Sequence, residues 1–589
     1  MSVDTPANQP IAKPTAPSTL ERWFPIAVWL PKYKWGPFVG LDLIAAVSVA
    51  ALLIPESMGY ASVAGVPAQI GLYAAPLALV GYALFGGSRL VVYAAAGSVA
   101  AVSAGVVGGL HAKSTSQAVT FTVALTLAAG AIFVVAGLAK MGWISNFMSK
   151  AVMAGFICAM AIGIIVGQLG HLTGIHESSG NTFQQLWSVL SKISSWNWTA
   201  TVLGILAIIL IFGLQRFAPK VPAALTAVIL TSIYVAAASP NIKLVKKIPR
   251  GLPSFTFPTG ISTATWVTLI TGGCVVALVG FSEGWGSVTT MARKTHSGDP
   301  DSNQEFRAFG AGLIGAGILG GMPVTGSLSK SAAAESAGAK SQMSNIFLAI
   351  VVLLTLAFLA PLFQWLPEAC LGAVVINAMW GSASPMKVVD FWKVDRVDFG
   401  LGVITGLVVL STTLLKGMLV GIFLSLIYLV FRVSFPGRAE LGRDAKTGEF
   451  EAREWIHGAK KGAGDPDAQP VPGVMIYRFD SPLIYSNSEA FKQTGEQFLI
   501  DAAAKGPLPK TLVIDFEEVF YTDVSGAGAL SSLHNYAERY GVGVSLARLH
   551  SQTRETLAAD GVLKEIGEDR IYDSVQDAVA AASQTEVGA

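Results

Sequence analysis

The sequence predicts an α-helical membrane protein with about fourteen transmembrane segments in two inverted seven-segment repeats, followed by a small cytoplasmic α/β domain. The composition is that of a membrane protein, because 52% of the residues are hydrophobic and only 13% are charged. Two small-residue stretches, at 94–100 (AAAGSVA) and 324–330 (VTGSLSK), interrupt apolar segments at corresponding places in the two halves. Such matched interruptions are typical of inverted repeats whose broken helices meet near the middle of the bilayer.

Apolar runs of the length that a bilayer requires, about 20 residues, begin near residue 40 and recur to about residue 429. We expect clear spans at 40–57, 119–139, 154–169, 200–212, 223–238, 266–281, 346–363 and 401–415. Shorter or glycine-rich pieces bring the expected total near fourteen, and they lie at 71–85, 309–319, 329–339, 371–379 and 418–431.

Positive charges predict the orientation of these spans. Basic residues flank both ends of the membrane region and place both ends in the cytoplasm, which requires an even number of crossings; they are Arg22, Lys32, Lys34, Arg432, Arg438 and Arg443. The basic loop at 243–250 would lie outside, against the bias that the other loops show. Residues 1–36 are predicted to form a cytosolic tail whose first 20 residues are disordered, without a signal peptide. We therefore expect a multi-pass protein of the plasma (inner) membrane.

After residue 434 the composition becomes polar. We expect a transmembrane domain at 37–434, a linker at 435–470 and a soluble domain at 471–585. In the soluble domain, strands are predicted at 474–479, 512–516 and 542–546, and helices at 489–505, 525–540, 552–561 and 575–582. Strands that alternate with helices indicate a small α/β domain.

The two interrupted segments predict an anion site. Two half-helix N-termini that face each other offer unpaired backbone N–H groups and about half a positive charge each. Gly97 and Gly326 would let an anion reach the backbone, and Ser98 and Ser327 would donate hydrogen bonds. The alternative is that these small residues only permit tight helix packing, but their repeated placement favours a site. Two further hydroxyl groups are candidates beside them, those of Thr325 and Ser329.

Lys330 places an ammonium group inside an apolar bundle, which is costly unless the group is paired, hydrated or facing a cavity. We expect it to attract the anion. The alternative is a lysine at a helix end that snorkels to the interface. Glu335, five residues further on, would be an imperfect partner on the same helix.

Two carboxyl groups also lie within apolar segments. Glu56 precedes Ser98 by 42 residues, and Glu283 precedes Ser327 by 44. Because burial disfavours the charged form of a carboxyl group, Glu283 is expected to take up a proton and to neutralise the charge of an incoming anion. Glu56 is expected to be a second proton carrier or a protonated hydrogen-bond donor. A structural carboxylate that caps a neighbouring helix is the alternative for Glu283. Tyr60 is expected to line the site with its ring, or simply to pack.

Several stretches resemble the sulfate permease (SulP) family of anion transporters. They are 54–61 (IPESMGYA), 65–67 (GVP), 71–73 (GLY), 82–89 (YALFGGSR), 323–332 (PVTGSLSKSA) and 392–399 (WKVDRVDF). The C-terminal part resembles a STAS domain at 471–474 (VPGV), 478–482 (RFDSP) and 522–526 (TDVSG). The resemblance covers roughly 41–581. It implies a fourteen-span fold divided into a core and a gate, commonly dimeric, that moves inorganic anions or small carboxylates by an elevator-like motion.

The chain departs from the family pattern at its candidate site. Residues 94–96 are all alanine where the family commonly has Gly-Pro and a larger residue, and Lys330 stands where it usually has Arg. A compact ammonium replaces a planar guanidinium fork, so we expect a roomier pocket less suited to bidentate recognition. Glu283 resembles the family's acidic residue linked to proton coupling, while Glu56 stands where relatives usually have Gln.

In the STAS-like part, Ser525 lies between a predicted strand and a predicted helix. It is predicted either to cap the helix or to accept a phosphate, as the matching serine does in isolated STAS proteins.

The favoured interpretation is a secondary active transporter of inorganic anions or small carboxylates, of the sulfate, bicarbonate or dicarboxylate class, coupled to protons rather than sodium. The alternatives are an uncoupled exchanger or channel on the same fold, a nucleobase transporter of related fold, and a membrane signalling scaffold centred on the STAS domain. We expect no enzyme activity, cofactor or metal, and a homodimer in the lipid bilayer. Because 40 Lys and Arg balance 38 Asp and Glu, we expect no nucleic-acid partner.

Overall fold

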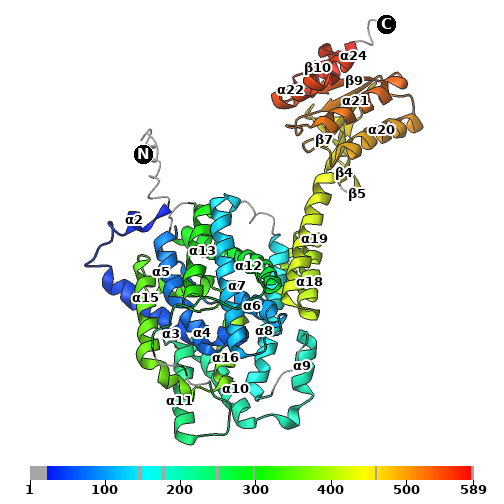
Figure 1. Cartoon of the computed structure of the whole chain (residues 1–589). Coiled ribbons are helices and arrows are strands. Elements are labelled where there is room, and N and C mark those ends of the chain that lie inside the picture. Colours follow the sequence, from blue (N-terminus) through cyan, green and yellow to red (C-terminus); the bar gives the residue numbers. More distant parts are fainter. Residues whose placement is uncertain are drawn as a thin grey trace, which may run out of the picture. The chain divides into compact units, whose positions relative to one another are not determined.

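The computed structural model (Figure 1) describes residues 23–142, 149–175, 180–219, 221–245, 248, 251–295, 299–457 and 460–584. The chain divides into two compact units, Met1–Ser425 and Leu426–Ala589. Two regions with sequence predictions lie outside the described residues. They are the tail expected to be disordered over the first 20 residues, and residues 246, 247, 249 and 250 of the basic loop at 243–250.

Long apolar runs form helices in the first unit, because a helix satisfies its backbone hydrogen bonds internally where water is absent. From the N-terminus these helices are α2 (Ile26–Trp29), α3 (Val39–Val63), α4 (Ala68–Tyr73), α5 (Ala75–Phe85), α6 (Gly97–Gly108), α7 (Thr115–Leu138), α8 (Lys150–Thr173), α9 (Thr182–Leu190), α10 (Trp198–Phe217) and α11 (Ala223–Ala238). They continue with α12 (Thr263–Thr295), α13 (Ser302–Ile318), α14 (Leu328–Ser336), α15 (Met343–Leu354), α16 (Glu368–Trp380), α17 (Met386–Val389), α18 (Arg396–Ser411) and α19 (Leu414–Ser434), and the boundary between the two units falls within α19.

The expected spans correspond to helices, with differences in length and continuity. Among the described residues, eight helical segments are long and apolar enough to cross a membrane, and three shorter apolar helices are α6, α11 and α16. The span expected at 266–281 lies within the 33-residue helix α12, and the piece at 71–85 is divided between α4 and α5. The total of about fourteen stays a prediction.

Helices from the two halves of the sequence interleave. Helix α13 packs against both α5 and α7, and α12 packs against α7 (Figure 1). In the same way α16 and α18 pack on α8, and α15 packs on α3. Glycines permit this approach: a Cβ atom at Gly310 of α13 would lie 2.6 Å from Cγ2 of Val134 in α7.

The second unit is an α/β domain built on an eight-stranded sheet. Its strands are β3 (Gly437–Asp444), β4 (Phe450–His457), β5 (Lys460–Ala463), β6 (Ala468–Gln469), β7 (Val474–Asp480), β8 (Thr511–Asp515), β9 (Gly543–Ala547) and β10 (Ile571–Tyr572), and its helices are α20 (Ser488–Lys505), α21 (Val524–Arg539), α22 (Ser551–Asp560), α23 (Val562–Ile566) and α24 (Val575–Gln584). The sheet order is β10-β9-β8-β7-β3-β4-β5, with β6 paired to β3. Strands β7 to β10 are parallel, as strands joined by helices predict.

Alternation along the strands gives this sheet two buried faces. Tyr477 and Ile514 belong to the cluster that packs against α20 and α21, whereas Ile476 and Val513 belong to the cluster that packs against α24. Successive side chains of a strand point to opposite faces, so the buried middle of β7 and of β8 is apolar on both sides. The three predicted strands and four predicted helices of this domain are confirmed, with bounds shifted by one or two residues.

Most of the described residues at 435–470 form paired strands rather than the expected linker. Strand β3 pairs antiparallel with β7, joining the segment to the parallel part of the sheet, and β4 and β5 extend it further. These strands are rich in charged residues because one side of β4 is partly exposed. A strand with a solvated face has the polar composition that also characterises a linker, and this explains the wrong prediction.

Candidate functional site

The two interrupted stretches meet in the structure. Residues Val92–Ala94 form β1 and Thr325–Ser327 form β2, and the two strands pair antiparallel, with Val92 opposite Ser327 and Ala94 opposite Thr325. Helix α6 begins at Gly97 and α14 at Leu328, so both half-helices start from the same short ribbon. The first backbone N–H groups of a helix have no partner within it. We call the place where β1, β2 and the starts of α6 and α14 meet the crossing. It brings together two sets of donors from distant parts of the sequence.

On the α6 side, the hydroxyl group of Ser98 donates a hydrogen bond to the carboxylate of Glu283 in α12. Two further bonds fix α12 against β2: Thr325 Oγ1 donates to the carbonyl of Gly280 at 2.5 Å, and Ser287 Oγ donates to the carbonyl of Gly326 at 3.0 Å. These bonds lie about one helical turn before and after Glu283. Glu283 is therefore positioned by its own helix, and its partner lies in the other repeat.

On the α14 side, the hydroxyl groups of three serines form hydrogen bonds at the start of the helix. Ser327 is the N-cap residue, and its Oγ accepts a long hydrogen bond, 3.5 Å, from the backbone N–H of Lys330. Its Oγ also lies 3.2 Å from Oγ of Ser329. Ser331 Oγ donates to the carbonyl of Ser327 at 2.6 Å and accepts from the N–H of Val92 at 2.9 Å. This last pair of bonds ties α14 to β1.

Lys330 is buried, with only 1% of its side chain exposed, and it does not snorkel. Its Nζ lies 2.6 Å from Oε2 of Glu56 in α3 and donates to the carbonyl of Ala95 at 3.2 Å. The ring of Tyr60 lies beneath the ammonium, 5.4 Å away at its centroid. A cation in such a place needs an opposite charge and hydrogen-bond acceptors, and the first repeat supplies both.

The partnership of Lys330 with Glu56 corrects the expectation for Glu335. Glu335 pairs instead with Lys294 of α12, with Nζ and Oε2 2.9 Å apart. Five residues correspond to about 500° of rotation around a helix, or 140° beyond a full turn. Lys330 and Glu335 consequently point to different sides of α14.

The small residues at the crossing are required by packing. A Cβ atom at Gly97 would lie 2.7 Å from Cε of Met379 and 3.3 Å from Cε1 of Tyr60, and one at Gly326 would lie 2.9 Å from the Cα atom of Gly284. The packing interpretation therefore accounts for both glycines. Polar side chains distinguish the crossing from an ordinary helix contact, because Ser98, Glu283, Lys330 and Glu56 are brought together there.

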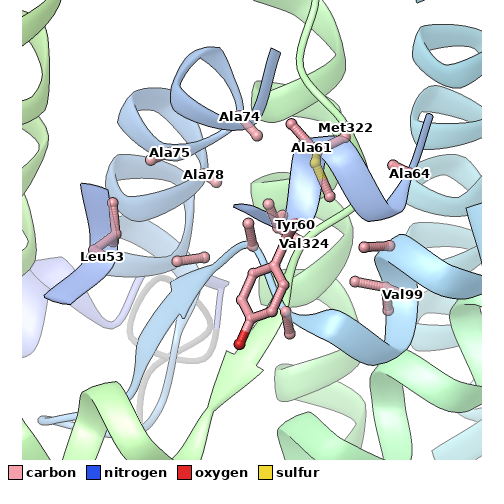
Figure 2. Packing of buried hydrophobic residues seen from close by; sticks show 14 of the residues in the cluster. Leu53, Tyr60, Ala61, Ala64, Ala74, Ala75, Ala78, Val99, Met322 and Val324 are labelled. Atoms are coloured by element: carbon pink, nitrogen blue, oxygen red, sulfur yellow. The ribbon is translucent and has the colours of Figure 1, made fainter. Parts of the chain in front are cut away.

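An apolar cluster surrounds the ribbon. Figure 2 shows Tyr60 among side chains from several helices, near Val324 and Val99, with Leu53 and Met322 in the same cluster. All of these side chains are buried. The ring of Tyr60 thus has two roles at once, because it belongs to this core and it also lies under the ammonium of Lys330.

Two cavities border α8, one along each half of the helix. A cavity of about 460 Å³ touches its N-terminal half and reaches Ser282 and Trp285, which flank Glu283; its lining includes Lys150, Met153, Ala154, Ile157, Phe281, Ser382 and Lys387. A cavity of about 570 Å³ touches the C-terminal half, and α6 lines it with Ala101, Ala104, Gly105 and Gly108. Neither Lys150 nor Lys387 stands out in the sequence as a candidate site residue. As isolated lysines beside spans, they carried no signal beyond orientation.

Ser525 of the STAS-like domain is not the helix cap. Asp523 is the N-cap residue of α21, and its Oδ1 accepts from the N–H of Gly526 at 2.8 Å while its Oδ2 accepts from the N–H of Tyr485 at 2.8 Å. The side chain of Ser525 is exposed in the first turn. Asp is as good a cap as Ser, and Asp523, two residues before Ser525, occupies the N-cap position. Phosphorylation of Ser525 stays a prediction.

Comparison with known families assigns both parts of the chain. Residues 39–405 match the model of the sulfate permease family, and residues 465–578 match that of the STAS domain. Sulfate transporter 4.1, chloroplastic, of Arabidopsis thaliana is 27% identical over 95% of this chain and 82% of its own length. A probable sulfate transporter of Mycobacterium tuberculosis is 29% identical over 95% of this chain and 98% of its own. The relatives named here are transporters, not enzymes.

Two solved structures share the fold. The murine solute carrier 26 family member A9 anion transporter, in its inward-facing state, matches with a TM-score of 0.86 and 21% identity over 98% of this chain and 97% of that one. The transmembrane domain of the cyanobacterial bicarbonate transporter BicA matches with a TM-score of 0.57 and 20% identity over 66% of this chain and 97% of that one. At these identities the likeness is one of fold.

Proposed function

Because the chain belongs to the sulfate permease family, a family of multi-pass membrane anion transporters, we propose that it is a proton-coupled secondary active transporter. Its substrate would be an inorganic anion or a small carboxylate bound at the crossing of α6 and α14. The observation that carries the proposal is that the best donors at this crossing, Ser98 and Lys330, are each held by a carboxylate. Similarity to proteins named for sulfate and bicarbonate transport favours those two anions.

Charge explains why protons would travel with the anion. With Glu56, Glu283 and Lys330 all ionised, the crossing carries one net negative charge. An anion that enters would add to this negative charge in an apolar environment, which is unfavourable. A proton on Glu56 would release the ammonium of Lys330 toward the anion. A proton on Glu283 would let the carboxyl group donate to Ser98 Oγ, which frees the serine hydroxyl to donate to the anion. Each proton thus removes a negative charge and makes a donor available.

The two cavities along α8 support alternating access to this crossing. One reaches the residues that flank Glu283 and the other follows α6 beyond Ser98. An elevator-like movement of the α6–α14 crossing past α8 would open it to each cavity in turn. We further propose that the protein lies in the plasma (inner) membrane with both termini in the cytoplasm, on the basis of the basic residues that flank the membrane region. The resemblance to the sulfate permease family supports a homodimer as a further part of the proposal.

Uptake of labelled sulfate, bicarbonate, chloride and dicarboxylates into proteoliposomes tests the proposal. Accumulation of one of these anions should follow an imposed inward proton gradient and should not need sodium. Transport without any dependence on the proton gradient would identify an uncoupled exchanger or channel. The absence of transport for every anion in protein that is folded and correctly inserted would contradict the proposal and favour the signalling scaffold.

A further inference from the structure

A third cavity lies away from the crossing, at the end of the core where α5 ends and α15 begins. Its volume is about 360 Å³. Four separate segments line it: the N-terminal segment with α2, the loop after α5, the start of α13, and the connection between α14 and α15. Among the described residues, its lining includes Lys32, Arg89 and Lys340 and no acidic side chain. The proposed transport mechanism does not use this cavity.

The three cations make the lining of the cavity positively charged. All three residues are exposed, and among the described residues none of them has an ion-pair partner. Two carboxylates lie behind the lining, those of Asp42 and Glu305, and both are buried and already bonded. Asp42 accepts from the N–H groups of Lys340 and Ser341 and from Ser341 Oγ. Glu305 accepts from Tyr82 Oη and from the N–H of Gly87. The cations are therefore available to a ligand.

The floor of the cavity is held by a hydrogen-bond network. Gln342 Nε2 donates to the carbonyl of Ser88 at 2.8 Å and to that of Val91 at 3.1 Å, and Asn345 Nδ2 donates to the carbonyl of Val91 at 2.7 Å. These bonds fix the loop after α5 to the start of α15. The N-terminal wall is fixed in turn by Trp29, whose Nε1 donates to the carbonyl of Ala83 at 3.3 Å. Arg89 and Lys340 thus lie on neighbouring, connected segments.

The surroundings of the cavity are those of a membrane interface. It lies beside the N-terminus of α3, where that apolar helix begins at Val39. Exposed aromatic side chains precede this helix, with Trp23 43% and Trp35 62% exposed. Tryptophan is enriched at the level of lipid head groups, and basic pockets at the ends of spans attract anionic lipids.

From these observations we infer that the cavity lined by Lys32, Arg89 and Lys340 binds the phosphate of an anionic lipid head group. Lysine and arginine supply charge-assisted hydrogen bonds to phosphate oxygens, and the apolar wall of the N-terminal segment, with Val28 and Trp29, suits the adjoining glycerol and acyl chains.

The cavity is connected to both broken helices. Arg89 is three residues before β1, and Lys340 follows α14 by four residues. A bound phosphate would draw together the segments that lead into and out of the ribbon. The inference therefore predicts that anionic lipid supports the geometry of the crossing, whatever anion is carried there.

Binding is tested by native mass spectrometry of the full chain in detergent, titrated with phosphatidylglycerol and, separately, with phosphatidylcholine. We expect phosphatidylglycerol to bind more tightly, and the triple variant Lys32→Gln, Arg89→Gln, Lys340→Gln to lose roughly tenfold or more in affinity for it. The matched control is a second triple variant, with Lys34→Gln, Lys393→Gln and Arg396→Gln. It removes three exposed cations that do not line the cavity, and it should bind phosphatidylglycerol with unchanged affinity. If the triple variant is not monodisperse, Arg89→Gln alone is measured.

Equal affinity of the cavity variant and the control for phosphatidylglycerol would overturn the inference. Competition with inorganic phosphate and with glycerol phosphate distinguishes the source of the ligand. Displacement of the lipid by millimolar amounts of either would assign the site to a soluble anion and overturn the lipid assignment. Because this readout is binding, it is independent of the proposed transport activity.

Discussion

The ammonium of Lys330 and the carboxylate of Glu56 form a buried ion pair that joins the second broken helix to the first repeat. Their Nζ and Oε2 atoms are 2.6 Å apart, and 1% and 5% of the two side chains are exposed. Each charge makes the other tolerable in an apolar bundle. The pair also sets the balance at the crossing, because an anion that approaches Lys330 must compete with Glu56.

Removing one member of this pair should destabilise the protein more than removing both. Glu56→Gln or Lys330→Met alone leaves one buried charge without its partner, at a cost of about 3–5 kcal/mol, whereas the double variant leaves none. Thermal unfolding of the purified full chain should show a higher midpoint for the double variant than for either single one. Lys294 and Glu335 provide a control pair with 47% and 36% of their side chains exposed. The corresponding single and double variants of that pair should give an interaction energy of about 1 kcal/mol or less.

Blocking the start of either half-helix should abolish transport. Replacing Ser98 or Ser327 with Leu removes a hydroxyl donor and places a bulky side chain where the anion would meet the backbone. Anion binding to the purified variants is the measurement, and Ser48→Leu, on an exposed position of α3, is the control. Should the Leu variants fold poorly, Ser98→Ala and Ser327→Ala should still weaken binding, by about 1–3 kcal/mol if the hydroxyl group donates to a charged ligand. Unchanged affinity in all of these variants would remove the crossing as the site.

Much of the crossing could be predicted because its residues recur in two copies. Ser98 and Ser327 were found from their matched distances to Glu56 and Glu283, and the structure places both serines at the starts of half-helices. The pairing of Lys330 with Glu56 could not be found in this way. It depends on how the two repeats interleave, and the spacing of residues within one segment contains no information on that.

The fold shows the same division between local and long-range information. Parallel strands such as β8 are buried on both faces and form continuous apolar runs, so their positions were predictable. Strands β3 and β4 belong to the same sheet, but their partly exposed faces carry charges such as Glu440 and Arg453, which pair with each other at 2.5 Å. The pairing of β3 with β7 is a tertiary contact, and composition alone made both strands resemble a linker.

The STAS domain should be dispensable for the transport step itself. Its sheet and helices form a compact unit of their own, and the proposed site lies wholly within the other unit. A chain that ends after Ser434, the last residue of α19, should retain measurable uptake in reconstituted vesicles. A monodisperse peak in size-exclusion chromatography establishes that the shortened chain is folded. Complete loss of uptake by such folded protein would show that the division of labour is wrong.

The β3–β4 hairpin of the STAS domain should depend on pH through Asp444. Hydrogen bonds from the backbone N–H groups of Lys446 and Thr447 to its Oδ1, at 2.6 Å and 3.1 Å, hold the pKa of this carboxyl group below its usual range. A depressed pKa stabilises the folded state above the ordinary value of about 4, and this contribution is lost as the pH falls through the folded pKa.

Asp444→Ala should therefore speed amide exchange in β3 and β4 of the full chain at neutral pH. Its difference from the wild type should shrink as the pH is lowered below about 4, once intrinsic exchange rates are corrected. Asp560→Ala removes an exposed carboxylate at the end of α22 and serves as the control. A difference that stays constant or grows toward acid pH would contradict the role of the ionised group.

Glu283→Gln should separate anion binding from proton coupling. The amide resembles the protonated carboxyl group in shape and can still donate to Ser98 Oγ, but it cannot release a proton. Exchange of labelled anion across the membrane should therefore persist, while accumulation driven by an inward proton gradient should disappear. In the wild type, uptake should rise as the external pH falls, because protonation of Glu283 would free Ser98 for the anion. The measurement is accumulation in proteoliposomes under an imposed pH gradient at zero membrane potential.

Glu305→Gln is the control for this prediction, since Glu305 is also buried in the membrane unit but contacts Tyr82 and Gly87 rather than the crossing. It should keep gradient-driven accumulation. If Glu283→Gln accumulates anion as well as the wild type does, Glu283 is not the coupling site, and the same assay on Glu56→Gln then tests the carboxylate that holds Lys330. If accumulation follows a sodium gradient instead, the coupling ion is sodium, and the hydroxyl groups around Glu283 become the groups to test.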